Sequence, residues 1–299
     1  MERLKDKVAL VFGAGPNIGG TIAHFLAREG ARVIVNDMQE TVARETVEFI
    51  KLRGHQAEAS TGSALVEADV ARVVEQAVER WGRLDIVVNM AGKIHWSSVV
   101  DMDLKDWSEG LLSFPTAGML TTKHGARAMI KSGRGGSIIH LLSTAAHFGE
   151  AGASCYTAAK AALMNLARSA AMDLAHDKIR VNTITPCGME HNLWTIMRDE
   201  TLNPDFVVPD RRSWYSRNDF LQSIPLERFP RASDLAWAAV FLASDESSFM
   251  TGADIPVDGG LRHKYPAWRP GAQTGVNIKD YIRELRITEY GEVGRKLVP

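Results

Sequence analysis

Residues 8–20 read VALVFGAGPNIGG, an apolar run followed by a glycine cluster and the start of an amphipathic stretch. An apolar run that ends in glycines predicts a buried strand, a tight turn and a helix. Glycines let the backbone approach a pyrophosphate, and the N-terminus of the next helix then faces its negative charge. The pattern predicts a dinucleotide site, and a tight turn without a ligand is the alternative. The candidate contacts are Gly13, Gly15, Asn17, Ile18 and Gly19.

The same rhythm of strand, turn and helix repeats along the chain. The runs 8–12 and 86–88 are apolar throughout, as strands covered on both faces are. This favours an α/β fold of three layers, a doubly wound parallel sheet of the Rossmann type. Strands are expected at 8–12, 32–36, 84–89, 137–142, 179–184 and 254–257, and helices at 18–29, 40–53, 103–131, 153–176 and 232–243.

Composition excludes several classes of protein. The chain has 299 residues, with 35 Lys and Arg against 36 Asp and Glu, a net charge of −1. This balance offers no basic surface for nucleic acid or for an anionic membrane. With 45% hydrophobic residues the chain is globular in composition, not disordered.

The location of the protein follows from cysteine usage and from the N-terminus. Two cysteines, Cys155 and Cys187, are too few for a disulfide framework and have no metal-ligand spacing, so no metal is expected. The N-terminal apolar run is too short for a signal peptide, and no run reaches the ~18 apolar residues of a membrane span. We expect a cytoplasmic protein.

Length at roughly 150 residues per domain suggests two domains. The motifs instead favour one catalytic dinucleotide-binding domain over 1–262. Two stretches depart from the α/β rhythm: 191–230, an aromatic-rich insertion expected to cover a site, and 263–299, an aromatic C-terminal extension. The extension is a candidate cover for the active site of a neighbouring subunit.

An acidic residue, Asp37, ends the second expected strand, eighteen residues after Gly19. A carboxylate there accepts hydrogen bonds from the ribose hydroxyls and repels a 2′-phosphate. Neither Pro16 nor Met38 is a lysine or arginine that would attract that phosphate. These residues predict NAD as the cofactor instead of NADP, and an ordinary loop acid is the alternative.

A further motif, YTAAK, places Tyr156 and Lys160 on one face of an expected helix, thirteen residues after Ser143. The chain resembles the short-chain dehydrogenase/reductase family in residue types and in their order over about 5–262. The motifs in order are GAGPNIG (13–19), NMAG (89–92), Ser143, YTAAK (156–160), IRVN (179–182), Pro186 and TGADIPVDGG (251–260).

The resemblance implies a division of labour among three catalytic residues. Tyr156 is the general acid and base, Ser143 orients the substrate oxygen, and Lys160 holds the nicotinamide ribose. A phenol of pKa ~10 is a poor base, and an ammonium about 4 Å away is expected to lower its pKa by ~2 units. The alternative is that Tyr156 and Lys160 only pack along one face of a helix and take no part in catalysis. The resemblance also implies cofactor contacts from Ser63, Asn89, Ala91, Gly92, Tyr156, Lys160, Pro186 and His191.

Three residues depart from the family pattern. Asn17 replaces a glycine and is expected to adopt the left-handed conformation that the turn needs. Ser63 stands where the family has an acidic residue that contacts the adenine of the cofactor. Phe114 stands where the family has a catalytic asparagine, and we expect its main-chain carbonyl and a kink at Pro115 to hold a water beside Lys160. A damaged proton relay is the alternative.

The substrate pocket is expected near 93–96, 144–150 and 191–230, with His95, His147 and Trp194 as candidate substrate contacts. So many aromatic residues favour a bulky, ring-containing substrate. The alternative for these aromatics is subunit packing.

These features together predict an NAD-dependent dehydrogenase that interconverts a secondary alcohol and its ketone. A carbonyl reductase is the alternative direction, and a weakly catalytic dinucleotide-binding sensor is the alternative of another class. The resemblance implies a homo-oligomer, a tetramer or a dimer.

Overall fold

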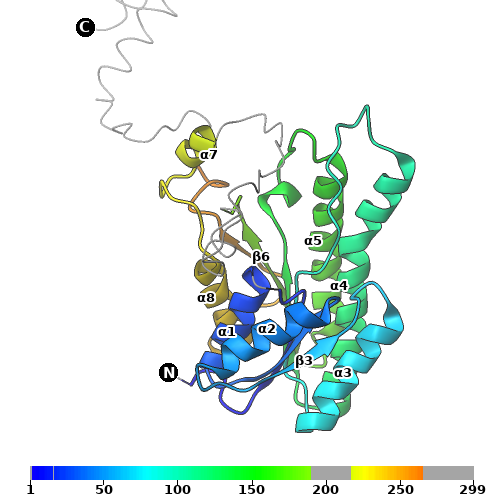
Figure 1. Ribbon diagram of the computed structural model, residues 1–299, viewed down its shortest axis with the longest axis vertical. Coiled ribbons are helices and arrows are strands. Elements are labelled where there is room, and N and C mark those ends of the chain that lie inside the picture. Colours follow the sequence, from blue (N-terminus) through cyan, green and yellow to red (C-terminus); the bar gives the residue numbers. More distant parts are fainter. Residues whose placement is uncertain (1, 16, 190–216, 265–299) are drawn as a thin grey trace, which may run out of the picture. The chain divides into compact units, whose positions relative to one another are not determined.

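The computed structural model describes residues 2–15, 17–189 and 217–264 (Figure 1). One compact unit, Met1–His263, holds every helix and strand described. The predicted insertion lies outside the described residues up to position 216, and the predicted extension lies outside them from position 265. His191 and Trp194 therefore lie outside the described residues.

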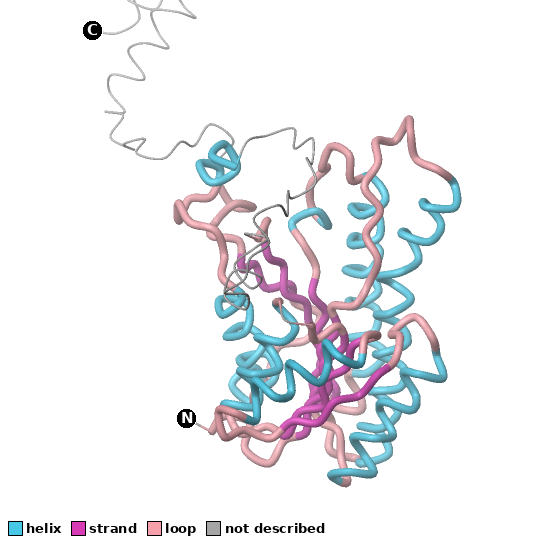
Figure 2. The backbone as a smooth tube through the Cα atoms, in the orientation of Figure 1, coloured by secondary structure: helices cyan, strands magenta, loops and turns pink. Residues whose placement is uncertain are grey.

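The described strands form one parallel sheet of seven strands in the order β3-β2-β1-β4-β5-β6-β7 (Figure 2). The order reverses direction between β1 and β4, which makes the carboxyl ends of these two strands the switch point where such folds bind ligands. The predicted doubly wound Rossmann sheet is confirmed. The strands are β1 Val8–Phe12, β2 Arg32–Asp37, β3 Ala57–Thr61, β4 Ile86–Asn89, β5 Gly136–Leu141, β6 Ile179–Pro186 and β7 Asp254–Val257.

Helices cover both faces of the sheet (Figure 1). Ala9 and Val11 of β1 pack on one face with α1, α2 and α8, while Val8 and Leu10 pack on the other face with α3, α4 and α5. Burial on both faces explains why the strands read as unbroken apolar runs. The described helices are α1 Ile18–Arg28, α2 Glu40–Lys51, α3 Glu67–Trp81, α4 Leu104–Ser132, α5 Ser154–Leu174, α7 Arg217–Ser223 and α8 Ala232–Ala243, with 3₁₀ turns η1 Thr144–Ala146 and η2 Asp245–Ser247.

Strand β3 and helix α3 are absent from the predicted elements. Strand β3 has the sequence AEAST and lies at the edge of the sheet, where only Ala57 and Ser60 are buried. A strand at the edge of the sheet does not need a continuous apolar run, so the sequence of β3 shows no strong hydrophobic pattern.

Helices α4 and α5 pack closely because glycines of α4 face side chains of α5. A side-chain carbon on Gly110 would lie 2.6 Å from the sulfur of Cys155, and one on Gly118 would overlap Leu163. This close packing fixes where Tyr156 and Lys160 of α5 lie relative to α4. None of the described helices is both long enough and apolar enough to span a membrane.

Candidate active site

The glycine turn after β1 is tightly folded. Gly13 has φ +72°, and a side-chain carbon on Gly19 would overlap the Gly13 carbonyl oxygen. One on Gly20 would lie 2.6 Å from the Gly15 carbonyl oxygen, which already accepts hydrogen bonds from the Asn17 and Gly20 amides. Glycine is therefore required at these positions by backbone conformation and by close approach of the chain to itself.

The expectation that Asn17 adopts a left-handed conformation is wrong. Asn17 has φ −103° and ψ −135°, and its side chain does not cap helix α1. Gly13 supplies the left-handed residue of the turn instead. A residue with a β-carbon is tolerated at position 17 because the positive φ angle occurs four residues earlier.

Asp37 ends β2 beside the glycine turn. Its Oδ1 accepts a hydrogen bond from the Gln39 amide at 3.0 Å, and its Oδ2 lies 3.5 Å from the place of a side-chain carbon on Gly15. Among the described residues no lysine or arginine forms an ion pair with Asp37. The carboxylate is thus placed beside the glycine turn with acceptor capacity for a hydroxyl donor.

Asn89 and Gly92 follow the neighbouring strand, β4. The Asn89 Oδ1 accepts a hydrogen bond from the Ala91 amide at 3.1 Å, and its Nδ2 is buried with no partner among the described residues. A buried donor without a partner is costly, and a ligand oxygen would satisfy it. The glycine turn, Asp37 and this amide fit a dinucleotide cofactor.

Ser63 and Pro186 lie at the carboxyl ends of β3 and β6. The Ser63 amide donates to Asp69 at 3.0 Å, and its hydroxyl accepts from the Leu65 amide at 3.2 Å. These bonds tie Ser63 into the turn before α3. Contact of either residue with a cofactor stays a prediction.

The structure brings Ser143, Tyr156 and Lys160 together. Ser143 follows β5, while Tyr156 and Lys160 lie one turn apart in α5. The Ser143 side chain lies near enough to Tyr156 to lower the pKa of the phenol by hydrogen bonding. The Lys160 ammonium is buried and donates to the Leu141 carbonyl at 2.7 Å.

Two aromatic rings contact Tyr156. The Trp96 ring lies 5.6 Å from it and the Phe114 ring 5.5 Å, centroid to centroid. Phe114 is buried, and a side-chain carbon on Gly92 would overlap its ring. Trp96 lies in the segment 93–96 that the sequence predicts near the pocket, but its contact with Tyr156 could not be predicted, because a single tryptophan in a loop carries no sequence signal for its tertiary contacts.

The ionisation of this group differs from the sequence-based expectation. Burial raises the pKa of Tyr156 above its ordinary value, against the opposing effect of the Ser143 hydrogen bond. Burial also lowers the pKa of Lys160 to about 7. The expected lowering of the Tyr156 pKa is therefore wrong for the protein alone, because desolvation outweighs the effect of the Ser143 side chain.

Helix α4 continues through Pro115 from Leu104 to Ser132, so any bend there does not interrupt the helix. Ser113, two residues before Pro115, is not among the predicted site residues. Its hydroxyl donates to the Lys93 carbonyl and accepts from the Lys93 amide, both at 3.0 Å. Ser113 thereby anchors the segment that carries Trp96. The water held by the Phe114 carbonyl stays a prediction.

The two histidines proposed as substrate contacts have partners within the protein. The His95 Nδ1 lies 3.4 Å from Asp106, and the His147 Nε2 lies 3.0 Å from Asp254 and 2.5 Å from Arg262. These contacts anchor the loops after β4 and β5, and contact with a substrate stays a prediction.

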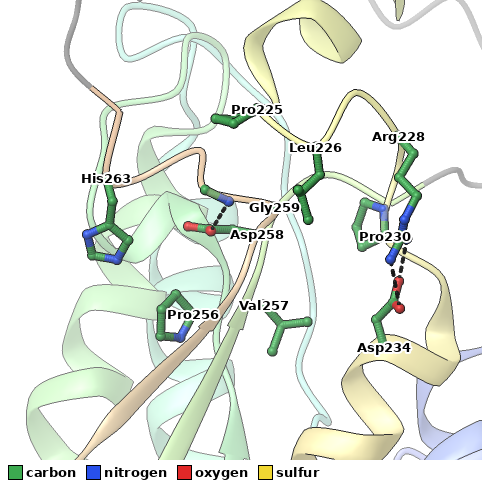
Figure 3. A pocket seen from close by; sticks show the side chains of 11 residues that line it. Pro225, Leu226, Arg228, Pro230, Asp234, Pro256, Val257, Asp258, Gly259 and His263 are labelled. Carbon is green, nitrogen blue, oxygen red and sulfur yellow. Dashed lines mark hydrogen bonds and ion pairs between the residues drawn. The ribbon is translucent and has the colours of Figure 1, made fainter.

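A cavity of about 560 Å³ lies beside the carboxyl end of β7 (Figure 3). Arg228 and Asp234 form an ion pair at its edge, and Pro225, Pro256 and Val257 supply apolar walls. It contains none of Ser143, Tyr156 and Lys160, so it is separate from the catalytic group.

The glycine turn at a switch point together with a Ser-Tyr-Lys group defines a nucleotide-dependent oxidoreductase. The family model described as Enoyl-(Acyl carrier protein) reductase matches residues 13–262. The chain belongs to the short-chain dehydrogenase/reductase family, which implies an NAD(P) cofactor.

Known relatives cover most of the chain. The 2,5-dichloro-2,5-cyclohexadiene-1,4-diol dehydrogenase LinX of Sphingobium indicum is 33% identical over 87% of this chain and 97% of its own. A sorbitol dehydrogenase of Cereibacter sphaeroides is 32% identical over 86% and 98%. The crystal structure of a putative short-chain alcohol dehydrogenase from Sinorhizobium meliloti is similar with a TM-score of 0.76 and 32% identity, over 88% and 98%.

Replacing Ser143 by alanine is expected to raise the pKa of Tyr156 by about 1 unit. The Ser143 hydrogen bond favours the phenolate, and a bond to a charged group contributes ~1.5–3 kcal/mol, against ~1.36 kcal/mol for each pKa unit. Tyrosine ¹³Cζ NMR measures this pKa, with the resonance assigned by its loss in Tyr156→Phe.

The matched control is Ser108→Ala, which removes an exposed hydroxyl of α4 that donates to the Leu104 carbonyl. It is expected to leave the pKa of Tyr156 unchanged. An unchanged or lower Tyr156 pKa in Ser143→Ala contradicts the assignment.

Proposed function

We propose that this chain is an NAD-dependent dehydrogenase that interconverts a secondary alcohol and its ketone. The observation that carries the proposal is the grouping of Ser143, whose side chain lowers the pKa of Tyr156, with Tyr156 and the buried Lys160 one helical turn away. The glycine turn, Asp37 and Asn89 would hold NAD, which would supply the hydride acceptor in oxidation and the hydride donor in reduction. In oxidation, the Tyr156 Oη takes the hydroxyl proton while the Ser143 Oγ donates a hydrogen bond to the substrate oxygen.

Asp37 supports NAD over NADP. Its carboxylate at the end of β2 lies beside the glycine turn and has no cationic partner among the described residues. An acceptor there suits ribose hydroxyls and repels a phosphate. Met38, the next residue, is largely exposed and uncharged.

The raised pKa of Tyr156 also favours carbonyl reduction as a second candidate function. In the protein alone the residue is a phenol near neutral pH, the form that donates a proton to a ketone oxygen. In the oxidative direction, the positive charge of the oxidised nicotinamide ring would favour the phenolate. The sensor hypothesis is less well supported, because a protein that only binds a dinucleotide needs no buried lysine beside a phenol.

The aromatic rings at Tyr156 favour a ring-containing substrate. Trp96 contacts Tyr156, which places an indole ring beside the hydroxyl that would exchange a proton with the substrate, and aromatic side chains suit ring-containing ligands. LinX acts on a cyclic diol by its name, whereas the sorbitol dehydrogenase acts on an open-chain polyol. The two relatives leave the class of alcohol open, so Trp96 carries this part of the proposal.

Exposed apolar side chains on α4 support a homo-oligomer. Leu104, Leu112 and Met119 follow one another at spacings of eight and seven residues, which places them along one face of the helix, and their exposed fractions are 76%, 59% and 41%. Both cysteines are buried and free, which fits the reducing cytoplasm. We assign residues 1–262 to the catalytic domain and 263–299 to an extension.

Replacing Tyr156 by phenylalanine is expected to slow NADH formation from cyclic secondary alcohols by about 10²–10⁴-fold, the usual contribution of a general acid or base. Absorbance of NADH measures the rate with a panel that includes cyclohexanediols and sorbitol.

Cyclic alcohols are expected to have a higher kcat/KM than sorbitol, and the variant Trp96→Ala is expected to reduce that preference. Absence of turnover by the wild type with every alcohol and ketone would favour the sensor, and a preference for sorbitol would exclude the ring-binding site.

Replacing Asp37 by serine together with Met38→Arg is expected to reduce the ratio of kcat/KM for NAD to that for NADP by at least about tenfold, equivalent to ~1.4 kcal/mol. The substitutions remove the repelling carboxylate and add a phosphate-binding guanidinium. Asp173→Ser, on the exposed face of α5, is the control and leaves the ratio unchanged. An unchanged ratio in the double variant would show that Asp37 does not select the cofactor.

Replacing Leu112 by glutamate is expected to reduce the particle mass measured by light scattering, because a charge in the centre of an apolar interface is costly. Lys105→Glu, on the exposed N-terminal part of the same helix, is the control for added charge. A wild-type protein that is monomeric at micromolar concentration contradicts the oligomer.

A further inference from the structure

The Lys160 ammonium lies in an apolar environment with few polar partners. Lys160 is 3% exposed, and among the described residues its Nζ donates one hydrogen bond, to the Leu141 carbonyl. No carboxylate of the described residues forms an ion pair with it. Burial alone therefore works against the charged form and lowers its pKa to about 7.

One face of the Phe114 ring is directed at this ammonium. The Lys160 Nζ lies 4.0 Å from the ring centroid, well inside the ~6 Å range of a cation–π contact. The ring is held in place: Phe114 is 3% exposed, Gly92 leaves room for it on one side, and Tyr156 packs against it edge to face. A fixed, desolvated aromatic face stabilises a cation more strongly than an exposed one does.

The other groups that face Lys160 do not supply negative charge. On α5 the Tyr156 ring centroid lies 5.8 Å from the Nζ, and burial favours its neutral phenol. On β5 the buried His140 bonds to Thr122 of α4 at 3.0 Å, and its pKa is lowered to about 4 by burial and by Lys160. Both are neutral near pH 7, so among the residues that the structure describes the Phe114 ring and the Leu141 carbonyl are the groups that stabilise the ammonium.

We propose that Phe114 is a positioning residue whose ring holds the Lys160 side chain in its charged form and directs it toward Tyr156. An aromatic face thereby replaces, at this position of α4, the polar residue that the family uses there. The role in catalysis rests on the proposed function, whereas the stabilisation of the ammonium does not.

The direct test is the pKa of Lys160 in the free protein, measured by NMR of lysine labelled with ¹³C at Cε and assigned by the loss of one resonance in Lys160→Arg. Incorporation of pentafluorophenylalanine at position 114 removes the attraction of the ring while nearly keeping its shape. The pKa of Lys160 is expected to fall by about 1 unit. Phe114→Tyr, which keeps an aromatic face, is expected to stay near the wild-type value.

The matched control is pentafluorophenylalanine at position 49, since Phe49 lies on α2, away from the catalytic group, and its ring centroid lies 3.5 Å from the guanidinium of Arg53, which follows that helix. It is expected to leave the pKa of Lys160 unchanged. An unchanged or raised pKa of Lys160 with pentafluorophenylalanine at position 114 overturns the inference.

Activity gives an independent readout. Pentafluorophenylalanine at position 114 is expected to shift the alkaline limb of the pH profile of kcat to lower pH by about the same 1 unit. The reason is that Lys160 then loses its proton at a lower pH. If no alcohol is turned over but the NMR shift appears, the proposed function fails and this inference stands. If turnover is normal but the NMR shift is absent, this inference alone fails.

Discussion

The catalytic group depends on the burial of one ammonium. Helix α5 brings Lys160 against β5, where the Leu141 carbonyl accepts its only hydrogen bond among the described residues. A buried charge of this kind persists only when the surrounding groups compensate for lost hydration. The close packing of α4 on α5 at Gly110 and Gly118 determines which groups of α4 lie near the ammonium and can compensate in this way. This constraint is the basis of the role that we propose for the ring of Phe114.

The same burial determines the proton chemistry of Tyr156. Ser143 favours the phenolate, and desolvation favours the phenol more strongly. The free protein therefore holds a protonated tyrosine beside a lysine whose charge is only marginally stable near neutral pH. Binding of an oxidised cofactor would add positive charge and shift the pair toward the phenolate, so the direction of catalysis depends on which form of the cofactor is bound.

The sequence was enough to predict the sheet and the placement of Tyr156 and Lys160 one turn apart on a helix, because both depend on local patterns. Apolar strands followed by glycines, and the spacing of Tyr156 and Lys160, are visible without any tertiary contact. The aromatic contacts of Trp96 and Phe114 and the pairing of His147 with Asp254 and Arg262 were not predictable, since each joins segments far apart in the chain. Desolvation also depends on packing, which is why the predicted direction of the Tyr156 pKa shift was wrong.

The most direct test of hydride transfer follows a deuterium label. A cyclic secondary alcohol deuterated at its carbinol carbon is incubated with the protein and NAD, and the reduced cofactor is analysed by mass spectrometry. Transfer from the carbinol carbon predicts a reduced cofactor one mass unit heavier than the one formed from unlabelled alcohol, and Tyr156→Phe should form it far more slowly. A reduced cofactor without the label, or equal rates in the two proteins, would contradict the mechanism.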